Sequence, residues 1–123
     1  MKILMSIHNE HIKNIKNGNK KFEFRKVEAK KFNDNEIFIY ATAPISKVVG
    51  VAKIKKVHIN TPEKIWEFTK DFSGIDNRFY DNYYENKKKA IAYEIENYIE
   101  FDQPKSLIDF GLSCAPQSFA YIK

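Results

Sequence analysis

Apolar residues along the chain form short runs and alternating segments that predict five or six strands. These segments are residues 2–7, 21–26, 36–41, 47–59, 90–101 and 118–122. The segment 36–41 is apolar on both faces, which is typical of a central strand. The alternation in 47–59 changes phase near Gly50, and this change predicts the bulge or sharp bend that a small barrel needs.

Three helix signals lie between these strands. Asn9 can cap a helix that stops at Gly18, a residue that tolerates the left-handed conformation of a helix C-terminus. Thr61 followed by Pro62 predicts the start of a second helix, and Asp76 predicts the start of a third. Strands and helices together predict a small α+β domain on a curved or closed sheet. The length of 123 residues predicts one domain that spans residues 1–123.

The composition is that of a folded globular protein, because 43% of the residues are hydrophobic and 15% are aromatic. No apolar run approaches the roughly 18 residues that a membrane-spanning helix needs. The first ten residues lack the small-residue cleavage site of a signal peptide. Cys114 is the only cysteine and forms no internal disulfide, which fits a reducing compartment. The expected location is cytoplasmic, without a membrane partner.

The formal net charge of +5 favours polyanionic partners, above all nucleic acids. A lysine-rich composition loads lysine onto any surface, however, so the charge supports nucleic-acid binding only modestly. The tyrosines add to this support. Tyr80 and Tyr84 are predicted to form an exposed pair that can stack on unpaired bases, whereas Phe79 and Tyr83 are predicted to face the core.

Residues 18–25, with the sequence GNKKFEFR, combine two rings and several charges in one short strand. Alternation directs Phe22 and Phe24 to one face, where they supply the core, and it directs Glu23 and Arg25 to the other. The charged face has two interpretations. It is either a solvent-exposed salt bridge worth about 0–1 kcal/mol or a face that binds a ligand.

The spacing of Gly18, Lys20, Glu23 and Arg25 fits the pattern G-x-K-x-x-E-x-R in full. This pattern resembles the signature of the ASCH domain family. Four further segments look like small prokaryotic members of that family, namely MKILMSI, IYATAPISKVVG, TPEKIWEFTKDFSGI and SLIDFGLSCAPQSFAYI. The resemblance covers essentially the whole chain. It implies a PUA-like fold, which is a small bent β-barrel of five to six strands with about three short flanking helices, and it implies RNA binding in a cleft between barrel and helices.

The resemblance also implies roles for the motif residues. Gly18 lets the chain turn tightly from helix to strand. Lys20 points its ammonium group toward the cleft, where it suits a phosphate or a polarised carbonyl. Glu23 and Arg25 either pair with each other or share a ligand, in which case Arg25 binds a phosphate or a base edge and Glu23 accepts from an exocyclic amine. The motif selects Lys20, although strict alternation places Lys21 on the charged face.

Four further residues can border the same cleft and bind the ligand. Ser6 and Tyr40 stand near the ends of the first and third strands. Gln117 and Ser118 lie just before the last strand, where Gln117 can read a base edge and Ser118 can bind a phosphate. The alternative for each of these residues is a purely structural hydrogen bond or turn.

The histidines give no metal signal. His8, His11 and His58 show no metal-ligand spacing with each other or with Cys114, so the sequence predicts no metal site and no cofactor. His8 and Thr42 also stand at strand ends, and a structural hydrogen bond is the favoured interpretation for both.

Two main classes of function follow. The first is a binding module for RNA or a nucleotide-like ligand such as a modified nucleoside, held in a basic cleft. The second follows from the resemblance, since some members of that family are ribonucleases or amidohydrolases, and it is a metal-independent enzyme on RNA or a modified nucleoside with Lys20 and Glu23 as the catalytic pair. The amidohydrolase pattern has a threonine nucleophile where this chain has Glu23, so that activity is not expected. A transcription-linked regulator is a third alternative that follows from the resemblance.

Overall fold

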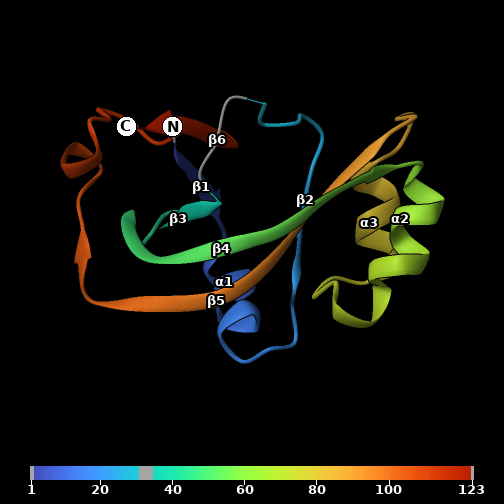
Figure 1. The fold of residues 1–123 in the computed structure, drawn as a ribbon, viewed down its shortest axis with the longest axis horizontal. Coiled ribbons are helices and arrows are strands. Elements are labelled where there is room, and N and C mark those ends of the chain that lie inside the picture. Colours follow the sequence, from blue (N-terminus) through green and yellow to red (C-terminus); the bar gives the residue numbers. More distant parts are fainter. Residues whose placement is uncertain (1, 31–34, 123) are drawn as a thin grey trace.

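The computed structural model describes residues 2–30 and 35–122, and it shows a curled six-stranded sheet with helices packed against it (Figure 1). The strands are β1 (Lys2–Ile7), β2 (Phe22–Arg25), β3 (Glu36–Ala41), β4 (Lys47–Asn60), β5 (Ala90–Lys105) and β6 (Phe119–Ile122). The helices are α1 (Asn9–Lys16), α2 (Pro62–Thr69) and α3 (Asn77–Tyr83), with the 3-10 turns η1 (Lys70–Phe72) and η2 (Leu107–Phe110). The predicted α+β fold is confirmed, and the predicted small bent barrel of five to six strands is a curled six-stranded half-barrel with three flanking helices.

The sheet has the strand order β2-β5-β4-β3-β1-β6, so β2 and β6 are its two edges. β1 and β3 are parallel neighbours, and the other neighbouring strands are antiparallel. The register between β4 and β5 shifts between Val48 and Gly50. The Tyr98 ring lies against Gly50, where an added Cβ would be 2.5 Å from Tyr98 Cε1. The irregularity predicted near Gly50 is therefore confirmed, and it goes with the curling of the sheet.

Clusters of buried side chains attach the helices to the sheet. α1 packs Ile12 and Ile15 into a cluster that includes residues of β1, β3, β4 and β5. α2 and α3 lie side by side at one end of the molecule, beside the start of β5 (Figure 1). They share a second cluster with β2 and β5, formed by Phe22, Phe24, Ile65, Tyr80, Tyr84, Ala90 and Ala92. The predicted core position of Phe22 and Phe24 is thus confirmed.

Two of the three predicted helix starts carry the expected side-chain cap. Thr61 and Asp76 each accept a hydrogen bond from the backbone N–H three residues further on, at 3.4 and 2.8 Å. Asn9 is not a cap, because α1 begins at Asn9 itself and the preceding residue, His8, continues the extended backbone of β1. α1 ends shortly before Gly18, whose φ of 88° matches its predicted place in a turn. None of the helices in the described part of the chain is long and apolar enough to cross a membrane.

Three of the four aromatic side chains in and just after α3 differ from the prediction, whereas Tyr83 is half-buried and packs against the second cluster as predicted. Tyr80 and Tyr84 are buried, with 1% and 3% of their surface exposed, whereas Phe79 is 53% exposed. The prediction was wrong because both pairs have the same four-residue spacing, and spacing alone does not show which side of a short helix meets the core. That side is set by Phe24, whose ring meets the Tyr80 ring edge-to-face at 5.2 Å.

Phe24→Ala is expected to lower the free energy of unfolding by about 3–5 kcal/mol, because it empties the space between β2 and α3. Phe79→Ala is the matched control, since it removes the same atoms from an exposed ring and should cost much less. Urea titration followed by far-UV circular dichroism measures both values. Equal losses in the two variants would contradict the core assignment of Phe24.

Candidate functional site

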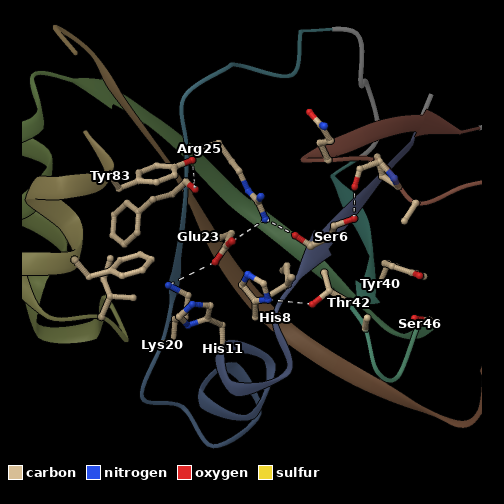
Figure 2. A pocket seen from close by; sticks show the side chains of 18 residues that line it. Ser6, His8, His11, Lys20, Glu23, Arg25, Tyr40, Thr42, Ser46 and Tyr83 are labelled. Atoms are coloured by element: carbon tan, nitrogen blue, oxygen red, sulfur yellow. Dashed lines mark hydrogen bonds and ion pairs between the residues drawn. The ribbon is translucent and has the colours of Figure 1, made fainter. Parts of the chain in front are cut away.

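A cavity of about 490 Å³ lies between the half-barrel, α1 and α3 (Figure 2). Its walls come from β2, from the ends of β1 and β3, from α1 and α3, and from the loop before β6. The polar side chains that line it are Ser6, His8, His11, Lys20, Glu23, Arg25, Tyr40, Thr42, Ser46, Tyr83 and Gln117. Apolar residues, including Phe24 and Phe79, complete the wall. The fold therefore brings together segments that lie far apart in the sequence.

The charged face of β2 is buried rather than exposed to solvent. Glu23 and Arg25 keep only 7% and 9% of their surface exposed. Arg25 Nη2 donates to Glu23 Oε2 at 2.7 Å and to the backbone oxygen of Ser6 at 2.8 Å. Arg25 Nη1 reaches Ser118 Oγ at 3.5 Å. The interpretation as a weak, solvent-exposed salt bridge is therefore wrong, because each buried charge depends on its partner.

Glu23 is ionised although it is enclosed. Burial alone raises the pKa of Glu23, but the positive charges of Arg25 and Lys20 outweigh burial and hold this pKa below its ordinary value. The two carboxylate oxygens are divided between the two cations. Oε2 pairs with Arg25, and Oε1 lies 3.5 Å from Lys20 Nζ. The protein itself thus engages both oxygens, which limits Glu23 as an acceptor for a ligand.

Lys20, and not Lys21, shares the cavity with Glu23. Lys20 is 3% exposed, and its Nζ donates to the backbone oxygen of Ser73 at 2.6 Å. Lys21 is exposed, and its Nζ lies 4.2 Å from the centre of the Phe72 ring. Strict alternation fails here because Lys20 precedes the first residue of β2 and belongs to the turn after α1.

The loop between η1 and α3 encloses the Lys20 side chain. Gly74 has a φ of 71°, and an added Cβ would lie 2.7 Å from Lys20 Cβ, so no larger residue fits at this position. Burial lowers the pKa of Lys20; Glu23 opposes this shift, and Arg25 adds to it. The ammonium group is therefore held in place from both sides, by the Ser73 carbonyl of the loop and by the Glu23 carboxylate.

Most of the residues predicted to bind a ligand line this one cavity, namely Ser6, Lys20, Glu23, Arg25, Tyr40 and Gln117. Two do not. Ser118 is not part of the wall, but its hydroxyl contacts Arg25. Gly18 lies at a second, smaller cavity of about 290 Å³, and its place in the motif is the turn that leads into β2.

The sequence did not single out several residues of the cavity wall. The sequence gives His11 only as one of three histidines without metal-ligand spacing, and it predicts Phe79 and Tyr83 for the core. His8 and Thr42 make the favoured structural hydrogen bond, Nδ1 to Oγ1 at 3.0 Å, and both also line the cavity. The signal that could have found His11 is its position three residues after His8, which directly precedes α1, because this spacing brings the two rings to 6.1 Å from each other. In the part of the chain that the structure describes, no group of three or more His, Cys, Asp or Glu side chains is placed to hold a metal ion.

Comparison with known protein families decides the relationship that the motif suggested. A family model described as the ASCH domain matches residues 5–105. The chain belongs to the ASCH domain family. The match runs from within β1 to the end of β5, so it includes the whole motif strand and both helices beside it. The resemblance inferred from the motif and its flanking segments is confirmed.

This ASCH protein is similar to proteins of different size. It is 33% identical over 87 residues to the large ribosomal subunit protein uL22 of Ureaplasma parvum serovar 3. The aligned segment covers 71% of this chain but only 28% of that protein. It is 27% identical over 109 residues to the ASCH domain-containing ribonuclease of Zymomonas mobilis. This alignment covers 85% of this chain and 74% of that protein. The crystal structure of ASCH from Zymomonas mobilis has the same fold, with a TM-score of 0.88 at 24% identity over 99% of this chain and 87% of that one.

Arg25→Met is expected to lower the free energy of unfolding by about 3–5 kcal/mol, because it leaves the buried Glu23 carboxylate without its closest cation. Arg78→Met is the matched control, since Arg78 is the other arginine of the chain and is exposed on α3. Adding Glu23→Gln to Arg25→Met is expected to recover part of the loss by removing the unpaired charge. Urea denaturation tests this, and a loss no larger than that of Arg78→Met would contradict the pairing.

Proposed function

We propose that this ASCH protein binds single-stranded RNA and holds one nucleotide of it in the cavity. The observation that carries the proposal is the presence of two cations, Lys20 and Arg25, and two aromatic rings, Phe79 and Tyr83, on the wall of one cavity. Cations suit phosphate oxygens, and aromatic rings stack on unpaired bases. A volume of about 490 Å³ lies within the range of pockets that enclose small ligands.

The exposed ring of Phe79 favours an unpaired strand over a duplex. In a duplex the bases are stacked inside the helix, and the major groove is too narrow for side chains to read. A base that has left the stack can enter a cavity and lie on a ring at its wall. Phe79 and Tyr83 therefore take the place that the sequence had assigned to Tyr80 and Tyr84.

Two further observations support RNA as the ligand. The chain has a formal net charge of +5, and in the cavity the two cations outnumber the single carboxylate, Glu23. The relative from Zymomonas mobilis that aligns with 85% of this chain carries the name ribonuclease. Both observations fit a polyanionic ligand whose phosphates face a basic cleft.

A single-stranded RNA oligonucleotide is expected to bind with an affinity that falls as salt rises, with a slope of roughly −0.7 per phosphate contacted. Phe79→Ala should weaken binding by about 1–3 kcal/mol, which is the value of one stacked base. Phe68→Ala is the matched control, because Phe68 is similarly exposed but lies outside this cavity. Fluorescence anisotropy over a salt series measures both effects. Equal affinity for duplex RNA, or an equal loss in both variants, would contradict the proposed site.

RNA cleavage is a second candidate function, favoured by the named ribonuclease among the relatives. In a phosphodiester cleavage without a metal, negative charge develops on the phosphate oxygens. The Lys20 ammonium group can stabilise this charge, and Glu23 positions that ammonium. Glu23 itself is a poor proton acceptor, since its pKa is lowered and both its oxygens are engaged. An amidohydrolase is less supported, because Glu23 stands where that pattern has a threonine nucleophile.

If the protein cleaves RNA, an end-labelled single-stranded RNA should be shortened in the presence of EDTA. Lys20→Met is expected to abolish this cleavage because it removes the charge that faces the phosphate. Lys64→Met, on the exposed side of α2, is the matched control and should cleave like the wild type. Gel electrophoresis of the labelled products measures the cleavage. Cleavage that disappears with EDTA, or that survives in Lys20→Met, would contradict it.

A further inference from the structure

The two ring nitrogens of His11 lie in different surroundings. His11 belongs to α1, lines the cavity and lies beside Lys20 (Figure 2). Its Nδ1 is buried and has no hydrogen-bond partner among the residues that the structure describes. Because Nδ1 is enclosed and the side chain lines the cavity, Nε2 is the ring nitrogen that a ligand in the cavity can reach. The asymmetry decides which nitrogen can meet a ligand.

The bare Nδ1 also favours one tautomer of the ring. A proton on Nδ1 would place an N–H donor in a buried position without an acceptor, which is unfavourable. A neutral His11 therefore carries its proton on Nε2, from which it can donate into the cavity. Burial lowers the pKa of His11, and this effect keeps the imidazole neutral near pH 7.

The cavity offers more donors than acceptors at this point. The Glu23 carboxylate is divided between Arg25 and Lys20. Lys20 Nζ has three N–H groups, and the Ser73 carbonyl and the Glu23 carboxylate account for two of them. Lys20 Nζ also lies 5.0 Å from the centre of the Phe24 ring, so this wall offers a ligand the positive charge of Lys20 and the Nε2–H of His11. Such a set of donors fits a group that presents acceptor oxygens, and it does not fit a group that presents only N–H donors.

We propose that His11 Nε2–H donates to a phosphate oxygen of the RNA backbone, which lies beside the Lys20 ammonium group in the cavity. The assignment rests on the proposed RNA-binding function and names the part of the ligand that this wall recognises. In this assignment His11 contacts the ligand directly, and the cavity binds a phosphodiester more tightly than a free nucleoside. A nucleoside without a phosphate lacks the group that these two donors bind.

This contact couples binding to pH. Four charged or titratable groups act on the pKa of His11. Glu10 lies in α1, His8 directly before it, Lys20 in the turn after α1 and Glu23 in β2. The neighbour from α3 is the uncharged Phe79 ring, whose centre lies 6.4 Å from that of His11. A phosphate placed on Nε2 raises the pKa of His11, so binding takes up a proton. The affinity is therefore expected to rise as the pH falls from about 7 to about 5.

The test uses a single-stranded 2′-O-methyl RNA oligonucleotide, which cannot be cleaved by attack of its 2′-hydroxyl and whose phosphodiesters do not titrate in this range. Its affinity is measured by fluorescence anisotropy across the pH series. His11→Phe keeps a ring beside Phe79 but removes the donor, so the affinity should fall by about tenfold. His11→Gln places an amide N–H near the position of Nε2, so it should stay close to the wild type at pH 7 and lose the rise at low pH. His58→Gln is the control, since His58 pairs with Glu94 outside the cavity.

The outcomes separate this assignment from the function on which it rests. If the wild type binds the oligonucleotide and His11→Phe binds it equally well, the His11 contact is wrong and RNA binding stands. If His11→Gln keeps the full rise at low pH, another group such as His8 carries the coupling, and the contact is again wrong. A competition measurement tests the phosphate assignment. If a free nucleoside displaces the oligonucleotide as well as a dinucleoside phosphate does, the phosphate assignment fails. A wild type that binds no oligonucleotide overturns the proposed function, and the contact with it.

Discussion

The guanidinium group of Arg25 holds three separate parts of the chain together in the interior. It binds the carboxylate of Glu23 on the same strand, the carbonyl oxygen of Ser6 near the end of β1, and the hydroxyl of Ser118 just before β6. β2 and β6 are the two edges of the sheet, so this side chain links edges that no backbone ladder joins. Two charges taken out of water are tolerated only as a pair. The half-barrel is therefore joined across its opening by the hydrogen bonds of Arg25 to Ser6 and Ser118, and the ion pair with Glu23 on the same strand borders the cavity.

The four residues of β2 contribute both to the core and to the charged wall of the cavity. Its rings, Phe22 and Phe24, complete the core beneath α2 and α3, and its charges face the cavity. Tyr83 connects the two sides, since it lines the cavity and its hydroxyl donates to the Phe24 carbonyl at 3.4 Å. Because the strand is buried on both faces, a substitution on one face can disturb the packing of the other.

Local patterns predicted most of the fold because they act over few residues. The caps at Thr61 and Asp76 and the irregularity near Gly50 depend on neighbours in the chain, and all three are present. Features that depend on distant segments were not predictable in the same way. Phe24 determines which side of α3 faces the core, through its contact with Tyr80. The charged face of β2 is buried because the sheet curls and brings Arg25 against Ser6 of β1. His11 acquires its place in the site only because α1 packs beside a cavity whose other walls come from far along the sequence.

Gly74 gives the connection between α2 and α3 an unusual constraint. Connections of this kind normally lie on the surface and accept insertions at little cost. Here the loop packs on the stem of Lys20, and its carbonyl at Ser73 receives the ammonium group. The same few residues therefore determine both where α3 stands and where the positive charge lies. A longer or shorter connection would displace the wall and the charge together, so the length of this loop is part of the definition of the site.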